Sequence, residues 1–220
     1  MEPDFDTDKD GILAASKATS LLVNESWDAK GHLTWDFATA FFVGPTKLLT
    51  AGHAVLDPPD AVKTDRFLFL PGTPYLTIDT ISNKHPHAIR YTVIDNMYRK
   101  GDTKIKDIAL ISSGTFETQH YLRLSTDRVV KDEIIEIVGY PGEKKTNWLR
   151  EKHPTLRSFD EASRISEAFL PTRQLVVTLG KVAHNDRDMT SYHISTCPGL
   201  SGAGLIYNGV AHGLEIFMLR

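Results

Sequence analysis

Short apolar segments rich in Val, Ile, Leu, Phe and Thr recur along the chain at intervals of roughly ten residues, with turn residues between them. Several of them alternate in polarity between the two faces of a strand. In "EIIEIV" (residues 133–138) most residues are apolar, which indicates a strand that is buried on both faces. The pattern therefore predicts strands at residues 19–25, 32–44, 47–52, 66–72, 88–95, 107–113, 133–141, 174–184, 190–196, 203–208 and 209–217.

So many short strands in one chain are typical of an all-β fold built from barrels or sandwiches. The least organised stretch begins at "ETQHYLRLSTD" (117–127) and separates two strand-rich halves of similar size. We therefore expect an acidic N-terminal tail over residues 1–15, a first β module over 16–117 and a second β module over 118–220.

One helix is expected, within an irregular surface insertion over residues 149–173. Ser158 or Asp160 could cap its start, and Pro171 ends it. Ile165 and Phe169 lie four positions apart, so they share one face of this helix.

The composition excludes several classes of protein. A net charge of -3 provides no basic stripe for a phosphate backbone, so we expect no nucleic-acid partner. No apolar run approaches the roughly 18 residues of a spanning helix, so we expect no membrane partner. The acidic start "MEPDFDTDKDG" lacks the features of a secretory signal and leaves the compartment unassigned. Cys197 is the single cysteine, which rules out an intrachain disulfide and a thiolate zinc cluster.

Two acidic or histidine-rich stretches could bind a metal, but neither has a complete set of ligands. In "DTDKDGI" (6–12) three aspartates precede a glycine as in a calcium loop, yet the twelfth position is Lys17 rather than Glu. His85 and His87 in "HPH" have no third ligand at a recognisable spacing. We therefore expect no metal and no cofactor.

Three separate contexts carry candidate chemistry, in the order His, Asp, Ser. His53 follows the strand "LLTAG", Asp107 opens "DIALI", and Ser201 lies between glycines in "PGLSGAG". A serine hydroxyl is a weak nucleophile, so it needs a base to take its proton and a carboxylate to hold that base in the correct tautomer. It also needs backbone N–H donors for the oxyanion, and we expect those of Gly199 and Ser201.

Each residue has a simpler interpretation taken alone: a packed histidine, an exposed aspartate at a strand start and a Gly-Ser-Gly turn. The combination and its order favour the catalytic interpretation. An α/β-hydrolase needs G-x-S-x-G with the histidine after the serine. Here position 203 is Ala203, and only His212 lies downstream.

"LLTAGHAV", "DIALI" and "CPGLSGAGLI" resemble the His, Asp and Ser blocks of the trypsin-like serine peptidases. That resemblance implies two antiparallel six-stranded β-barrels, with His53 as general base, Asp107 as its orienting partner and Ser201 as nucleophile. "VGYPGEKKTNW", "GKV" and "YHISTCPGLSGAGL" are more similar to the disulfide-poor glutamyl-endopeptidase branch. The likeness implies that Thr196 lines the primary specificity pocket of a monomeric enzyme acting on peptides or proteins.

The sequence also departs from this family. Leu200 stands where trypsin-like enzymes usually carry Asp or Asn, which removes the usual zymogen switch. Glu215 aligns with the substrate-reading histidine of the glutamyl branch, and a carboxylate there favours basic or neutral substrate side chains. A different bend of the loop would instead let His212 restore an acidic preference.

Only 19 residues (202–220) follow Ser201, where the family adds a further strand and a terminal helix. We therefore expect either a truncated chain or an incomplete second barrel. Intact triad residues favour an active endopeptidase, and the short end favours a non-catalytic peptide-binding or regulatory relative. Relatives of this family are mostly secreted, although this sequence carries no signal peptide.

Overall fold

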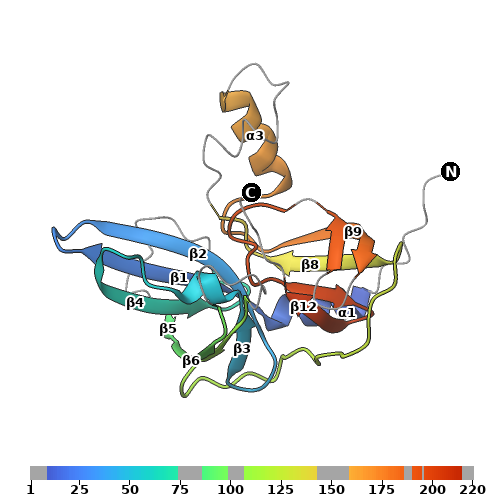
Figure 1. Ribbon diagram of the computed structural model, residues 1–220, viewed down its shortest axis with the longest axis horizontal. Coiled ribbons are helices and arrows are strands. Elements are labelled where there is room, and N and C mark those ends of the chain that lie inside the picture. The colour runs from blue at the N-terminus through green and yellow to red at the C-terminus, as the bar shows by residue number, and fades with distance from the viewer. Residues whose placement is uncertain are drawn as a thin grey trace.

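The computed structural model describes residues 9–73, 86–98, 107–142, 159–185, 190–194 and 196–214. Two curled antiparallel sheets dominate this part of the chain and lie side by side (Figure 1). Their strands occupy the segments in which the sequence predicted strands. The predicted all-β class is therefore confirmed.

The first sheet contains seven strands in the order β5-β4-β1-β2-β3-β7-β6. Its two edge strands, β5 and β6, follow each other in the chain with only Tyr91 between them. The sheet therefore curls until its edges meet, and it has the six strands of the expected barrel if β5 and β6 are taken as one bent strand. The bounds are β1 Thr19–Asp28, β2 Leu33–Phe42, β3 Lys47–Thr50, β4 Ala61–Phe69, β5 Ile89–Arg90, β6 Thr92–Asn96 and β7 Ala109–Ser112.

The second sheet has five strands within the described residues, in the order β10-β9-β8-β11-β12. Neighbouring strands are antiparallel throughout. The bounds are β8 Ile134–Gly139, β9 Val176–Asn185, β10 Thr190–His193, β11 Gly204–Tyr207 and β12 Val210–Leu214. β8 is buried on both faces, as its sequence predicted: Ile135 and Ile137 pack with Val182 on one face, and Val138 packs with Ile206 on the other.

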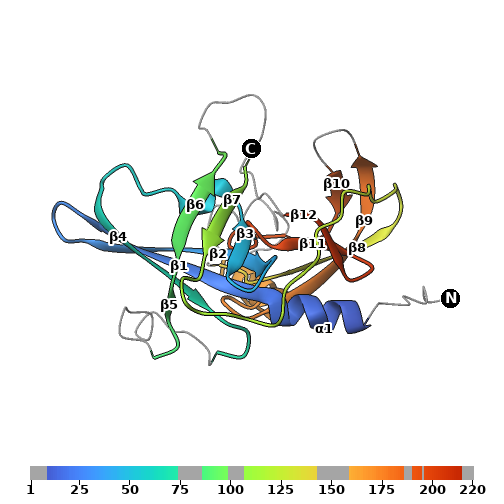
Figure 2. The same ribbon diagram turned by 90° about the horizontal axis from the view of Figure 1, so that it is seen from below.

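Residues 1–15 were expected to form a tail, and this expectation is wrong from Lys9 onward, because helix α1 spans Lys9–Ala18. Gly11, Ala15 and Ala18 lie three or four positions apart and form its buried face. Ala15 and Ala18 pack against Val138 and Ile206 of the second sheet, and Figure 2 shows the helix running alongside that sheet. The acidic composition of residues 1–15 gave no indication of this face of small residues.

The predicted helix in the insertion is confirmed as α3, Phe159–Phe169, which projects away from both sheets (Figure 1). Asp160 lies in its first turn, where a carboxylate interacts favourably with the helix dipole, rather than at the cap position. Among the described residues, no helix is long and apolar enough to cross a membrane.

Candidate active site

The pairing of β3 with β7 brings His53 and Asp107 together. Thr50, the last residue of β3, lies opposite Ala109, the first residue of β7. His53 follows β3 in a short 3-10 turn, η1 (Gly52–Val55), and Asp107 precedes β7 by two residues. Both side chains therefore lie at the same edge of the first barrel, although they are 54 residues apart in the chain.

Asp107 binds His53 through both carboxylate oxygens. Its Oδ1 accepts the His53 backbone N–H at 2.7 Å, and its Oδ2 lies 2.6 Å from His53 Nδ1. The Asp107 side chain is 4% exposed and that of His53 is 34% exposed. When the carboxylate accepts a hydrogen bond from Nδ1–H, Nε2 keeps its lone pair. The imidazole can then accept a proton at Nε2.

The loop that carries Ser201 is attached to β2 and to the segment just after β3 of the first barrel. The Thr39 backbone N–H donates to the Ser201 carbonyl at 3.0 Å. Gly202 has a φ of +87°, and a Cβ there would lie 2.2 Å from the Thr39 carbonyl oxygen and 2.8 Å from the Ala51 nitrogen. Gly202 thus lies against Ala51, two residues before His53, and only glycine allows this approach at position 202.

Gly199 fixes the other side of the same loop. Its φ is +90°, and a Cβ there would lie 2.0 Å from the Gly142 nitrogen, just beyond the end of β8. Gly142 N–H in turn donates to the Pro198 carbonyl at 2.7 Å. Within the described part of the chain, neither the Gly199 nor the Ser201 amide donates a hydrogen bond.

Comparison with known proteins agrees with this geometry at the level of the fold. No protein-family model matches the sequence, and no curated protein matches it. Among solved structures, the Rv3671c protease from M. tuberculosis in its active form superimposes with a TM-score of 0.56 at 13% identity, over 93% of this chain and 71% of that chain. The fold is that of a trypsin-like serine peptidase.

Two further structures of Rv3671c match in the same way. A serine-to-alanine mutant in the inactive form gives a TM-score of 0.54, and another inactive form gives 0.53. Each is 13% identical to this chain and covers 93% of it and 79% of its own length. An identity this low establishes the fold alone, so the likeness to the glutamyl-endopeptidase branch stays a prediction.

Two buried threonines that the sequence pattern did not single out, Thr39 and Thr50, connect the loop that carries Ser201 to the first barrel. Thr39 Oγ1 donates to the Gly199 carbonyl at 2.9 Å and accepts the Tyr140 N–H at 2.9 Å, so it links the loop that carries Ser201 to the residue that follows β8. Thr50 Oγ1 donates to the Thr39 carbonyl at 2.7 Å. The available signal was a hydroxyl within an otherwise apolar run, "FATAFF" for Thr39 and "KLLT" for Thr50.

The predicted specificity residues are described only in part. Thr196 is half-buried beside the buried Cys197, and Glu215 lies outside the described residues. His212 on β12 turns to the connection between the barrels, where its Nδ1 lies 2.9 Å from the Asp127 carbonyl oxygen. Leu200 is fully buried and packs closely against Gly139 of β8.

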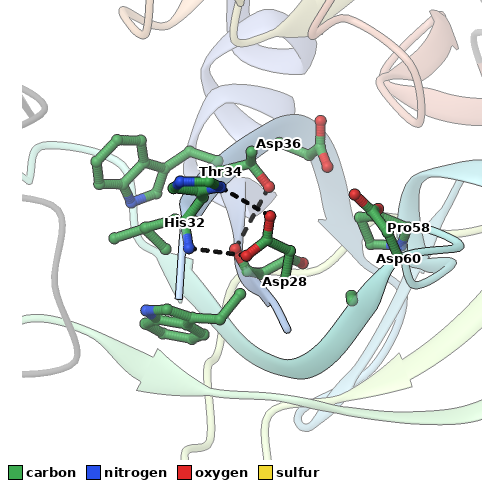
Figure 3. Close-up of a pocket in the computed structure, with 11 residues that line it drawn as sticks. Asp28, His32, Thr34, Asp36, Pro58 and Asp60 are labelled. Carbon is green, nitrogen blue, oxygen red and sulfur yellow. Dashed lines mark hydrogen bonds and ion pairs between the residues drawn. The ribbon is translucent and has the colours of Figure 1, made fainter. Parts of the chain in front are cut away.

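A separate cavity of about 510 Å³ lies at the tip of the β1–β2 hairpin (Figure 3). Its Asp28 carboxylate accepts the backbone N–H groups of Lys30 and His32 and faces His32 Nδ1 at 2.9 Å. The hydrogen bond from the His32 backbone is the main cause that lowers the pKa of Asp28. Thr34 in the cavity wall is five strand positions from Thr39, or roughly 17 Å, so the cavity is distinct from the candidate active site.

No group of three or more His, Cys, Asp or Glu side chains in the described ranges could hold a metal ion. Of the residues considered for metal binding, Asp6, Asp8 and His85 lie outside those ranges.

Proposed function

We propose that this protein is a serine endopeptidase that hydrolyses peptide bonds through an acyl-enzyme intermediate. The observation that carries the proposal is the pair of hydrogen bonds from His53 to the buried Asp107 carboxylate. The attachment of the Ser201 loop to the chain just before His53 supports it. The protease named among the similar structures supports it at the level of the fold.

In this mechanism the Ser201 hydroxyl oxygen attacks the carbonyl carbon of the substrate while His53 Nε2 takes the hydroxyl proton. Asp107 stabilises the imidazolium that results. The amides of Gly199 and Ser201 donate to the oxygen of the tetrahedral intermediate, which becomes negatively charged. The intermediate collapses as His53 gives its proton to the leaving amine, and the acyl group stays on Ser201.

Water then enters, and His53 takes a proton from it as its oxygen attacks the acyl carbon. Collapse of the second intermediate releases the carboxylic acid and returns the proton to Ser201. The proton that Ser201 gives to the leaving amine is replaced by one from water, so the cycle regenerates Ser201 and His53 and needs only the enzyme, the peptide and water.

The substrate preference follows from the predicted pocket residues. Thr196 lines the primary pocket, and the carboxylate of Glu215 disfavours an acidic side chain there and favours a basic or neutral one. A panel of peptides that differ only at the residue before the cleaved bond measures this substrate preference. Preferred cleavage after glutamate contradicts the predicted preference for basic or neutral side chains.

An active-site-directed fluorophosphonate probe tests the proposed function. Ser201 displaces fluoride from phosphorus and loses its proton to His53, so labelling reports an activated serine hydroxyl. We expect the wild type to be labelled, Ser201→Ala to be unlabelled, and the matched variant Ser191→Ala, altered at an exposed serine on β10, to be labelled like the wild type. Labelling that persists in Ser201→Ala, or folded wild type that is never labelled, contradicts the proposal. The latter result supports a non-catalytic peptide-binding relative.

A further inference from the structure

The end of β6 supplies a second support for the turn that carries His53. The side-chain amide of Asn96, the last residue of β6, donates from Nδ2 to the Gly52 carbonyl at 2.9 Å. Its Oδ1 accepts the Tyr98 backbone N–H at 2.9 Å. The Asn96 side-chain amide therefore connects Gly52, the residue before His53, to the backbone of Tyr98, although Asn96 and Gly52 are 44 residues apart.

The contact between these segments is close enough to require a glycine. A Cβ at Gly52 would lie 2.5 Å from Tyr98 Cβ and 2.6 Å from Asn96 Oδ1. The same Cβ would be 3.1 Å from Asp107 Oδ1, the oxygen that accepts the His53 N–H. Any side chain at position 52 would push the turn away from both of its supports.

Tyr98 brings this contact to the imidazole itself. Its ring meets that of His53 edge to face, with 6.3 Å between centroids and 69° between planes. The backbone of the same segment is fixed to the Asp107 side of the site, because the Met97 N–H donates to the Ile108 carbonyl at 2.9 Å. His53 is thus held by Asp107 at Nδ1 and bordered by a ring whose backbone is held by Asn96.

We propose that Asn96 is a positioning residue for His53: its amide fixes the Gly52 carbonyl and the Tyr98 main chain, and so sets the direction in which the imidazole points. This inference rests on the proposed function, because the orientation of His53 matters only if Nε2 receives a proton. Asn96 acts through the turn and the tyrosine ring. A displacement of about 1 Å in a reacting group can cost roughly 100-fold in rate, so the loss of such a support is measurable.

An amide is the side chain that both contacts require. It donates to the Gly52 carbonyl and accepts from Tyr98 N–H at the same time, which an ionised carboxylate cannot do because it only accepts. Asn96→Asp therefore keeps the shape and the Tyr98 contact but loses the Gly52 contact. Asn96→Ala loses both.

The first measurement is kinetic. For Asn96→Ala we expect kcat to fall roughly 10- to 100-fold with KM within about twofold, and the rate of fluorophosphonate labelling to fall by the same factor as kcat. Asn96→Asp should lie within about threefold of Asn96→Ala, because both lose the donor to Gly52. The matched variant Thr92→Ala, altered at an exposed position on the same strand, should stay within about twofold of the wild type. An unchanged kcat in folded Asn96→Ala and Asn96→Asp overturns the inference.

The second measurement does not depend on turnover. A 2.6 Å hydrogen bond to Asp107 shifts the His53 Nδ1 proton far downfield in the NMR spectrum. We expect a sharp resonance in the wild type and in Thr92→Ala, and a broadened or lost one in Asn96→Ala at the same temperature. A wild type that shows the resonance but is not labelled by the probe contradicts the proposed function alone. A resonance that is unchanged in folded Asn96→Ala overturns the positioning role.

Discussion

Asp107 uses its two oxygens for two different parts of His53. Oδ1 accepts the backbone N–H at 2.7 Å, which fixes the main chain of the turn, and Oδ2 lies 2.6 Å from Nδ1, which fixes the ring. A substitution that keeps the first contact and alters the second separates the folding role of this side chain from its chemical role.

Asp107→Asn is such a substitution. If its oxygen keeps the backbone contact, its NH₂ group faces Nδ1 and forces the imidazole proton onto Nε2. We expect peptide turnover to fall about 10⁴-fold, and His53→Ala to lose roughly 10⁴- to 10⁶-fold, as for other triads. Turnover and thermal unfolding are measured together, with the exposed Asp127→Asn as control. A loss under tenfold in either variant means that these are not the catalytic residues.

Gly202→Ala should disrupt the junction between the nucleophile loop and the first barrel. Its Cβ would lie 2.2 Å from the Thr39 carbonyl oxygen and 2.4 Å from Thr50 Oγ1, so we expect a loss of about 3 to 5 kcal/mol in the free energy of unfolding. Gly31→Ala is the matched control, because Gly31 has a similar φ of +81° but no atom within 4 Å. It should cost only the backbone strain, about 1 to 2 kcal/mol. If urea unfolding gives equal losses of stability for Gly202→Ala and Gly31→Ala, steric overlap is not the cause of the loss in Gly202→Ala.

Asn24 and Tyr91 form a buried polar pair in the first barrel. Asn24 Nδ2 donates to the Ala54 carbonyl at 2.7 Å, and the Tyr91 hydroxyl donates to Asn24 Oδ1 at 2.5 Å. We expect Asn24→Ala to lower the free energy of unfolding by about 2 to 4 kcal/mol, because it leaves two buried groups unsatisfied. Tyr91→Phe should cost about 1 kcal/mol. In a double-mutant cycle the two losses should be less than additive, and strict additivity contradicts the pairing.

Glu25 on β1 lies directly opposite Asp65 on β4, and burial raises the pKa of Glu25. A raised pKa means that the folded state binds this proton more tightly than the unfolded state does. The contribution of Glu25 to stability therefore declines as pH rises from about 4.5 through its folded pKa. Glu25→Gln should stabilise the protein at pH 7 and lose this advantage near pH 4.

Asp65 should behave in the opposite way, because the hydrogen bond from Lys63 at 2.7 Å lowers its pKa. Its favourable contribution is present above its unfolded value of 3.8 and is lost as pH falls through the folded pKa. Asp65→Asn should therefore destabilise the protein at pH 7 and have little effect at low pH. Urea unfolding of both variants at pH 7 and pH 4, and of Asp65→Asn also at a pH well below 3.8, measures the contrast. Changes of the same sign at pH 7 would contradict it.

The strands and the positions of His53, Asp107 and Ser201 at turns could be predicted because they depend on local patterns. Each strand has its own apolar period, His53 and Ser201 lie beside the small residues that a turn needs, and Asp107 opens an apolar run. The same reasoning missed α1, because its buried face consists of Gly11, Ala15 and Ala18, which add little to an apolar count. The composition shows that this segment is charged, but it does not show which of its residues are buried.

The supporting residues could not be predicted, because their contacts join distant parts of the chain. Thr39 is 160 residues from Gly199, and its alternation on β2 says nothing about which loop its hydroxyl meets. Asn96 appears in the sequence as the polar end of a strand, and its role depends on a carbonyl 44 residues earlier. Such contacts depend on how the folded barrels bring distant residues together, and no local hydrophobic period predicts them.

The packing of α1 against β8 and β11 affects how the protein is assembled during synthesis. The helix is made before the first barrel, whereas its partners Val138 and Ile206 are made after it. The alanine face of α1 therefore lacks the part of its native cover that Ile206 provides until Gly204–Tyr207 have been translated. A fragment that begins after the first barrel would lack α1, which packs on its core, so we expect it to be less stable than the same segment in the full chain.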